Sequence, residues 1–84
     1  MRHFASAKFW SLYTALPAPI RKAADKNYGL LRIDPRHPSL HFKKIGTLWS
    51  VRVGQHYRAL GIEVREGVQW FWIGTHADYD RLIG

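Results

Sequence analysis

The hydrophobic pattern of this chain changes its period once, near Ser39, and this change limits the folds that the chain can adopt. Before Ser39 the apolar residues recur every three or four positions, as they do in amphipathic helices. After Ser39 apolar and polar residues alternate, as they do in half-buried strands. The sequence therefore predicts a block of helices followed by a block of strands, which is an α+β arrangement.

Two helices are predicted in the first part of the chain. Ser6 is expected to cap the first helix, which carries apolar residues at the i, i+3, i+4 and i+7 positions and ends at Pro17. The second helix is expected to open at Pro19, because the fixed φ of proline suits a first turn. It should end at Asp34, which precedes another proline. The two helices are expected to form a hairpin on one face of a sheet.

Four strands are predicted in the second part, and each is bounded by turn residues. They cover residues 40–45, 48–53, 56–64 and 68–75. The predicted fold is therefore two N-terminal helices packed on one face of a twisted, mostly antiparallel four-stranded sheet, with the other face open. If residues 54–56 form the loop between the second and third strands, Arg52 lies opposite Arg58 on that open face. Two like charges repel across a ladder, so a phosphate between them is the natural stabilising ligand.

The length of the chain allows one domain, residues 1–84. A chain of this size buries only roughly 60–65% of its unfolded surface, which excludes a second core. Hydrophobic residues make up 46% of the chain, which is ample for a packed core and argues against disorder. No apolar run is long enough to span a membrane, so we expect a cytoplasmic protein without membrane contact.

Metal and cofactor sites are not expected. The chain has no cysteine, which excludes disulfides and cysteine-based zinc or iron–sulfur sites. His37 and His41 have a metal-like spacing, but Pro38 between them prevents a regular helix. No cysteine or nearby carboxylate completes a ligand set there, and no glycine-rich phosphate loop is present.

Positive charge is concentrated in one segment. The 13 Lys and Arg residues outnumber the 6 Asp and Glu residues, so a polyanion or an acidic protein is the expected partner. Residues 35–62 lack acidic residues altogether. The basic residues and histidines of this segment are Arg36, His37, His41, Lys43, Lys44, Arg52, His56 and Arg58. The alternative is an ordinary solvated face, or pairing of the two strand arginines with Glu63 and Asp78.

Two residues after the last predicted strand suit proton transfer. His76 titrates in the useful pH range, and Tyr79 follows it where a strand end projects side chains toward the open face. Cleavage of RNA without a metal needs a base, an acid and cations that stabilise the phosphorane, which His, Tyr, Lys and Arg together can supply. The alternative for His76 is a helix-cap or turn histidine. Asp78 is expected either to orient His76 or to cap the final turn.

Two segments resemble the RelE/ParE superfamily of bacterial toxins. Residues 48–58 end in the pair Tyr57-Arg58, and residues 72–79 contain Gly74-x-His76-x-x-Tyr79. The Leu16-Pro17 turn, and Asp34-Pro35 leading to Leu40-His41-Phe42-Lys43-Lys44, are similar to members of that group as well. The resemblance covers nearly the whole chain.

The chain departs from the superfamily in three places. RelE-type enzymes have a basic-x-basic pair on the central strand, whereas this chain has Ser50-x-Arg52. It has His76 where RelE has arginine. The N-terminal strand of the superfamily is missing or reduced to residues 2–4. These departures bear on catalysis more than on the fold.

The resemblance implies a toxin of a type II toxin–antitoxin module, in which a ribosome-dependent endoribonuclease cuts mRNA without a metal and inhibits translation. The catalytic residues that it implies are Arg52, Arg58, His76 and Tyr79. Arg52 would contact the phosphate and Arg58 would stabilise the transition state. His76 would act as acid or base, and Tyr79 would orient or activate the 2′-OH. The expected RNA-binding residues are Lys43, Lys44, His41 and His56. The expected partners are an acidic or amphipathic antitoxin, the ribosome and mRNA, with the toxin monomeric when free or part of a hetero-oligomer. Two alternatives remain, a ParE-like inhibitor that binds DNA gyrase and a non-toxic RNA-binding module.

Overall fold

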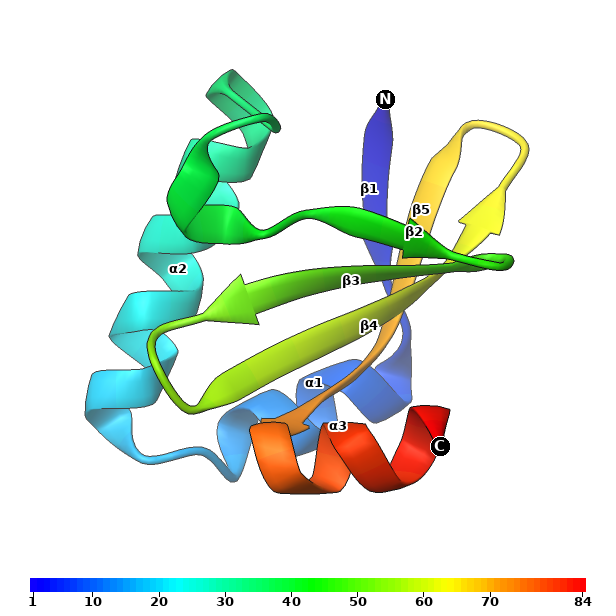
Figure 1. The fold of residues 1–84 in the computed structure, drawn as a ribbon. Coiled ribbons are helices and arrows are strands. Elements are labelled where there is room, and N and C mark those ends of the chain that lie inside the picture. The colour runs from blue at the N-terminus through cyan, green and yellow to red at the C-terminus, as the bar shows by residue number, and fades with distance from the viewer.

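The structure, a computed structural model that describes residues 1–84, has five strands and three α-helices (Figure 1). In chain order the elements are β1 (Arg2–Ala5), α1 (Ala7–Thr14), α2 (Ala18–Ile33), a 3₁₀ turn η1 (Pro38–Leu40), β2 (Lys43–Ile45), β3 (Leu48–Val53), β4 (Tyr57–Val64), β5 (Gly67–Thr75) and α3 (His76–Ile83). The strands form one sheet in the order β1-β5-β4-β3-β2. Only β1 runs parallel to its neighbour. The predicted α+β class is confirmed.

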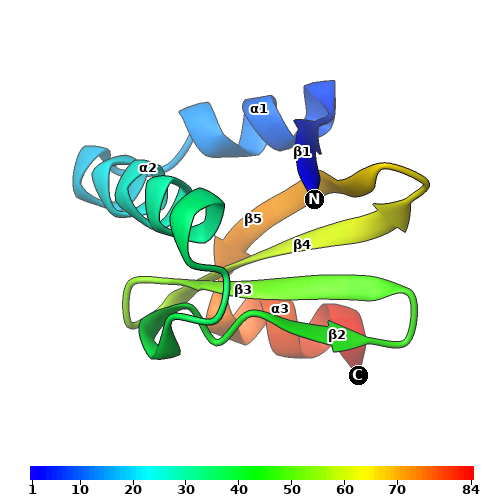
Figure 2. The same cartoon turned by 90° about the horizontal axis from the view of Figure 1, so that it is seen from above.

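The sheet lies between two layers of helix. Figure 2 shows α1 and α2 on one face and α3 on the other. The prediction of a fully open second face was therefore wrong, because the residues after the last strand, where only a final turn was expected, form a complete helix. Thr75 caps this helix by accepting a hydrogen bond from the backbone nitrogen of Asp78 at 3.2 Å. The helix crosses the ends of β4 and β5 and covers part of the face that carries the arginines.

The strand count also differs from the prediction, since the structure has five strands where the sequence indicated four. The additional strand is β1, which pairs in parallel with β5 in the register Arg2↔Gly67 to Ala5↔Trp70. The first predicted strand is shorter than expected because η1 occupies its start and His41 adopts a left-handed backbone with φ of 45°. Ser6 caps α1 as predicted, accepting a hydrogen bond from the backbone nitrogen of Phe9.

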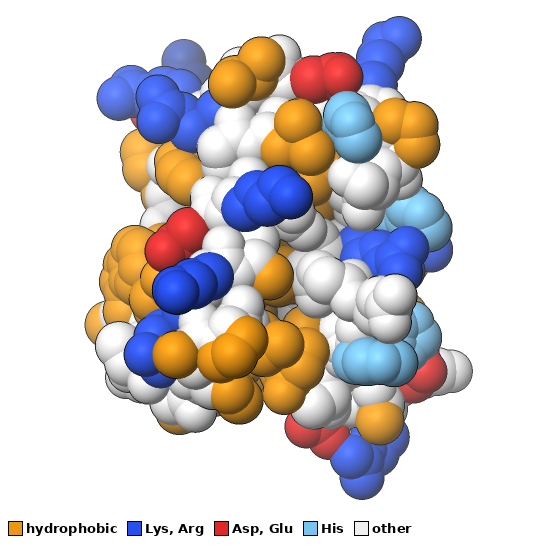
Figure 3. Space-filling view, turned by 90° about the vertical axis from the view of Figure 1, so that its left-hand side faces the viewer, with side chains coloured by type: hydrophobic (Ala, Val, Ile, Leu, Met, Phe, Trp, Pro, Cys, Tyr) orange, Lys and Arg blue, Asp and Glu red, His pale blue; other side chains and the backbone are white.

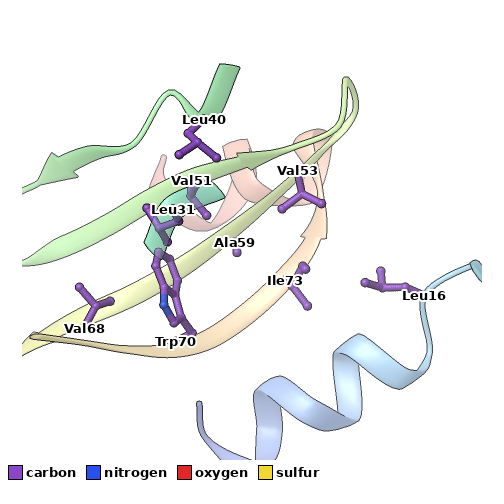
Figure 4. Close-up of a cluster of buried hydrophobic side chains, with 9 residues drawn as sticks. All are labelled: Leu16, Leu31, Leu40, Val51, Val53, Ala59, Val68, Trp70 and Ile73. Atoms are coloured by element: carbon purple, nitrogen blue, oxygen red, sulfur yellow. The ribbon is translucent and has the colours of Figure 1, made fainter. Parts of the chain in front are cut away.

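The hydrophobic core fills the space between the sheet and the two N-terminal helices (Figure 4). Its buried members are Leu16, Leu31, Leu40, Val51, Val53, Ala59, Val68, Trp70 and Ile73. Alternation along β3 and β4 explains this set, since Val51, Val53 and Ala59 point to the helices while their neighbours point away. No helix has both the length and the apolar character needed to cross a membrane.

His3 ties the edge strand β1 to the core. Its ring stacks on Trp70 with 6.1 Å between the ring centroids, and its Nδ1 accepts a hydrogen bond from Trp70 Nε1 at 3.2 Å. Burial lowers the pKa of His3 below its usual 6.5, and the N-terminal ammonium and Arg32 lower it further. The folded protein therefore favours a neutral imidazole at this position.

Acidification is expected to destabilise the fold through His3. As the pH falls below about 6.5, the unfolded chain binds a proton at His3 that the folded chain resists, so the free energy of unfolding decreases until the lower folded pKa is passed. His3→Gln should remove the part of this acid-induced decrease that is due to His3. The check is the difference in urea midpoint between about pH 7.5 and about pH 5.5. The exposed His56 provides the control, because His56→Gln should leave that difference as in the wild type.

Candidate functional site

The sheet face away from α1 and α2 carries two arginines side by side. Arg52 on β3 and Arg58 on β4 are direct partners across the ladder, as the three-residue loop predicted. Neither has a carboxylate partner. The alternative pairing with Glu63 and Asp78 was wrong, since each of these carboxylates forms an ion pair with a different basic residue.

Arg58 is the buried member of the pair, with 8% of its surface exposed. Its Nη1 lies 3.4 Å from the hydroxyl of Ser50, and its guanidinium lies over the ring of Tyr79 at 5.2 Å from the centroid. Its Nε is buried and has no hydrogen-bond partner. Withdrawing a cation from water costs several kcal/mol when no opposite charge compensates. Arg58 therefore retains donor capacity that suits an anion.

The last helix brings Tyr79 and His76 to the same place. Tyr79 is only 3% exposed, and its hydroxyl is buried without a hydrogen-bond partner. The rings of the two residues are 5.7 Å apart. His76 is the first residue of α3 and is exposed, and its Nδ1 lies 3.1 Å from a carboxylate oxygen of Asp80. Asp80, not Asp78, is therefore the carboxylate that orients His76.

The four predicted catalytic residues are together but not equally accessible. Arg52 is half-buried, and its Nε donates a hydrogen bond to the carbonyl of Gly54 at 2.8 Å. An anion can approach Arg52 and the exposed His76 directly. The Nε of Arg58 and the hydroxyl of Tyr79 are buried, and the Arg58 guanidinium lies against the Tyr79 ring of α3, so a ligand reaches these two atoms only if the packing of α3 on the sheet opens. The expectation that Tyr79 projects into the open was therefore wrong.

The predicted RNA-binding residues are exposed but spread over two faces. Lys43 pairs across the ladder with Ser50, which places it on the face of the two arginines. Lys44 belongs to the opposite face and forms an ion pair with Glu63 at 2.9 Å, and hydrogen bonding from Lys44 lowers the pKa of that carboxyl. His41 is the residue that ends η1, so it does not belong to the strands that carry the two arginines.

His56 lies beside the start of α3. Its backbone carbonyl accepts a hydrogen bond from the backbone nitrogen of His76 at 2.7 Å. Two residues that the sequence did not assign to the site support it, namely Asp80 beside His76 and Asn27, whose side chain donates to the carbonyl of Arg52 at 2.8 Å. Ser50, which the sequence showed only as a departure from the basic-x-basic pattern, lies beside the Arg58 guanidinium. Of these contacts, the sequence could indicate only the one between His76 and Asp80, because residues four positions apart are neighbours on a helix. No group of three or more potential metal ligands is present.

Comparison with known proteins supports the fold. No protein-family model matches the chain, and no curated protein does. A RelB–RelE antitoxin–toxin complex from Methanococcus jannaschii is similar with a TM-score of 0.72 and 15% sequence identity, over 96% of this chain and 99% of that chain. The isolated E. coli RelE toxin is similar with a TM-score of 0.63 and 13% identity, over 96% of this chain and 93% of that chain. The chain thus has the RelE-like fold that its sequence resemblance predicted.

Proposed function

We propose that this RelE-like chain is the toxin of a type II toxin–antitoxin module, and that it inhibits translation by cutting mRNA on the ribosome. The observation that carries the proposal is the buried Arg58, a cation without a carboxylate, next to Tyr79 and His76. The proposed partners are a cognate antitoxin, the ribosome and mRNA, in the cytoplasm. The free toxin is proposed to be a monomer, and the neutralised form a toxin–antitoxin hetero-oligomer.

The proposed reaction is a metal-independent transesterification. The 2′-oxygen of the RNA attacks the adjacent phosphorus, and the bond from phosphorus to the 5′-oxygen breaks. His76 transfers a proton as acid or base, and Tyr79 orients or activates the 2′-OH once α3 has shifted. Arg52 contacts the phosphate, and Arg58 stabilises the negative charge of the transition state.

The departure from the basic-x-basic pattern leaves this site with one cation fewer on β3, because the uncharged and fully buried Ser50 stands where the pattern has a basic residue. Lys43 lies opposite Ser50 on the same face and is proposed to position the RNA there. The proposed RNA contacts extend beyond this site to Lys44, His41 and His56. The ribosome would hold the mRNA in the required orientation, which is an entropic contribution that a small domain cannot make alone.

The test is induction of the chain in bacterial cells, followed by primer-extension mapping of mRNA. Cuts should appear on translated messages, while the same message without a start codon should stay intact. Inhibition of DNA gyrase by binding is the competing function, because the fold would serve either activity. Loss of supercoiling without mRNA cuts would favour gyrase inhibition and exclude the nuclease.

Arg52→Ala is expected to make RNA binding less sensitive to salt. Each phosphate contact contributes about 0.7 to the slope of log affinity against log salt for single-stranded nucleic acid, so the slope should fall by about that amount. The measurement is the affinity for a short single-stranded RNA over a series of salt concentrations. Arg65→Ala, in the exposed turn between β4 and β5, is the control and should keep the wild-type slope. An unchanged slope in Arg52→Ala would argue against the phosphate contact.

A further inference from the structure

One hydrogen bond orients the ring of His76 at the start of α3. Its Nδ1 lies 3.1 Å from a carboxylate oxygen of Asp80, which is one helical turn further along α3. No other side chain forms a hydrogen bond with this ring, so its Nε2 has no partner in the protein. The side chain of His76 is 48% exposed. The free Nε2 is therefore the ring nitrogen that a ligand can meet.

The surface around the start of α3 suits an anionic strand. In Figure 3, histidine side chains gather along the right-hand side, with Lys and Arg among them. His56 adjoins the start of α3, because its backbone carbonyl accepts a hydrogen bond from the backbone nitrogen of His76 at 2.7 Å. Arg52 lies four residues before His56 and has no carboxylate partner. A phosphate strand that is attracted to this side would meet the exposed edge of the His76 ring.

Asp80 is the carboxylate that is free to act on His76. Asp78 forms an ion pair with Arg81, whereas Asp80 pairs with no Lys or Arg. A hydrogen-bond acceptor that faces one ring nitrogen of histidine holds the hydrogen on that nitrogen. A neutral His76 next to Asp80 therefore carries its hydrogen on Nδ1 and a lone pair on Nε2. A neutral histidine in water mostly carries its hydrogen on Nε2, so Asp80 reverses the usual arrangement.

The contact between His76 and Asp80 does not depend on how α3 packs. Both residues belong to one turn of the helix, whereas the contact between Arg58 and Tyr79 joins β4 to α3. When the packing of α3 on the sheet opens, Arg58 and Tyr79 separate, but the carboxylate stays beside the imidazole. His76 thus keeps the same arrangement of its hydrogen whether α3 is packed or displaced.

We propose that Asp80 is a positioning residue that holds the hydrogen of neutral His76 on Nδ1, so that Nε2 serves as the base in the proposed cleavage. The inference rests on the proposed function for the reaction, and it assigns the direction of proton transfer at His76. The proton of the 2′-OH passes to Nε2 as the bond from the 2′-oxygen to phosphorus forms. The bond from phosphorus to the 5′-oxygen breaks with its electron pair on that oxygen, which water protonates. The carboxylate of Asp80 stays ionised and stabilises the imidazolium.

NMR tests the position of the hydrogen without any reaction. Two-bond ¹H–¹⁵N correlations of the ring distinguish a protonated nitrogen from a free one, and they are recorded at about pH 8.5, where an ordinary histidine is neutral. We expect His76 of the wild type to carry its hydrogen on Nδ1, and His76 of Asp80→Ala to carry it mostly on Nε2. Asp78→Ala removes a carboxylate from the same helix but not from His76, so it should match the wild type. A hydrogen on Nε2 in the wild type, or no change in Asp80→Ala, would overturn the inference.

Single-turnover cleavage on programmed ribosomes tests the contribution to the reaction. Asp80→Ala should lower the maximal rate roughly tenfold or more and change the half-saturating ribosome concentration by less than about twofold, because Asp80 does not contact the RNA. Asp80→Glu should retain most of the rate, since its carboxylate still reaches a residue four positions away on the helix. Asp78→Ala should cleave like the wild type.

A double variant separates positioning from a structural role. In a His76→Ala background, Asp80→Ala should cause no further loss of cleavage, because a residue that acts only through His76 has nothing left to position. A further loss in this background would show that Asp80 is structural and would overturn the inference.

The two proposals can fail separately. If the wild type cuts mRNA and Asp80→Ala cuts it at the same maximal rate, the positioning role fails while the proposed function stands. If the wild type cuts no mRNA on ribosomes, the proposed function fails and the base role of His76 fails with it. The ring signals then still decide whether Asp80 holds the hydrogen on Nδ1.

Discussion

His76→Ala is expected to lower mRNA cleavage on the ribosome by roughly 10²- to 10⁴-fold, the contribution of a positioned acid or base. His76 is exposed and lies at the start of α3, so the substitution should leave the fold intact. The measurement is the single-turnover rate of cleavage on programmed ribosomes. His37→Ala is the control, because it also removes a histidine but lies before η1, and it should change the rate by less than about twofold.

Tyr79→Phe separates the two functions that the fold could serve. It removes a hydroxyl that is buried without a hydrogen-bond partner, so the folded protein loses no bond while the proposed reaction loses its contact with the 2′-OH. Full toxicity in both His76→Ala and Tyr79→Phe, together with reduced gyrase supercoiling, would exclude the nuclease. Full cleavage with intact supercoiling would show that other residues transfer the proton.

Arg58→Met is expected to lower cleavage by roughly 10²- to 10³-fold while leaving the protein as stable as the wild type or more stable. The two effects have opposite signs because Arg58 is buried without a carboxylate, and its Nε has no partner. Replacing a buried charge with an apolar side chain of similar length is often neutral or stabilising. Cleavage is measured on programmed ribosomes, and the free energy of unfolding is measured by urea titration.

The control for this stability argument is Leu60→Ala. Leu60 follows Arg58 by two positions on β4 and is only 2% exposed, so truncation should cost about 2–5 kcal/mol through lost burial and the cavity left behind. If Arg58→Met lost stability to the same extent, Arg58 would be a structural residue. If it kept full cleavage, the transition-state role would be refuted.

The central strands and their arginines could be predicted because local rules determine them. Alternation defines β3 and β4, and a three-residue loop sets their register, so the pair Arg52 and Arg58 followed from the sequence. The resemblance of the two C-terminal segments to RelE indicated the fold as a whole. It did not indicate how accessible Arg58 and Tyr79 are, because that depends on how residues 76–83 pack as a helix.

The two elements that were missed have only weak local signals. β1 has four residues, which are too few to give a clear periodic pattern, and it pairs with a strand more than sixty positions away in the chain. α3 buries only Tyr79, which is too few apolar contacts to give a helical stripe. Without that helix the sequence could not show that Asp80 lies beside His76, or that Tyr79 and Arg58 are covered.

The alternation along β3 and β4 has an evolutionary consequence. Val51 and Ala59 belong to the core beneath the N-terminal helices, and Arg52 and Arg58 follow or precede them on the same two backbones. A substitution that repacks this part of the core would therefore shift the arginines on the other face. Under the proposed function, core packing and cleavage would then change together, so selection on one of these properties would act on the other.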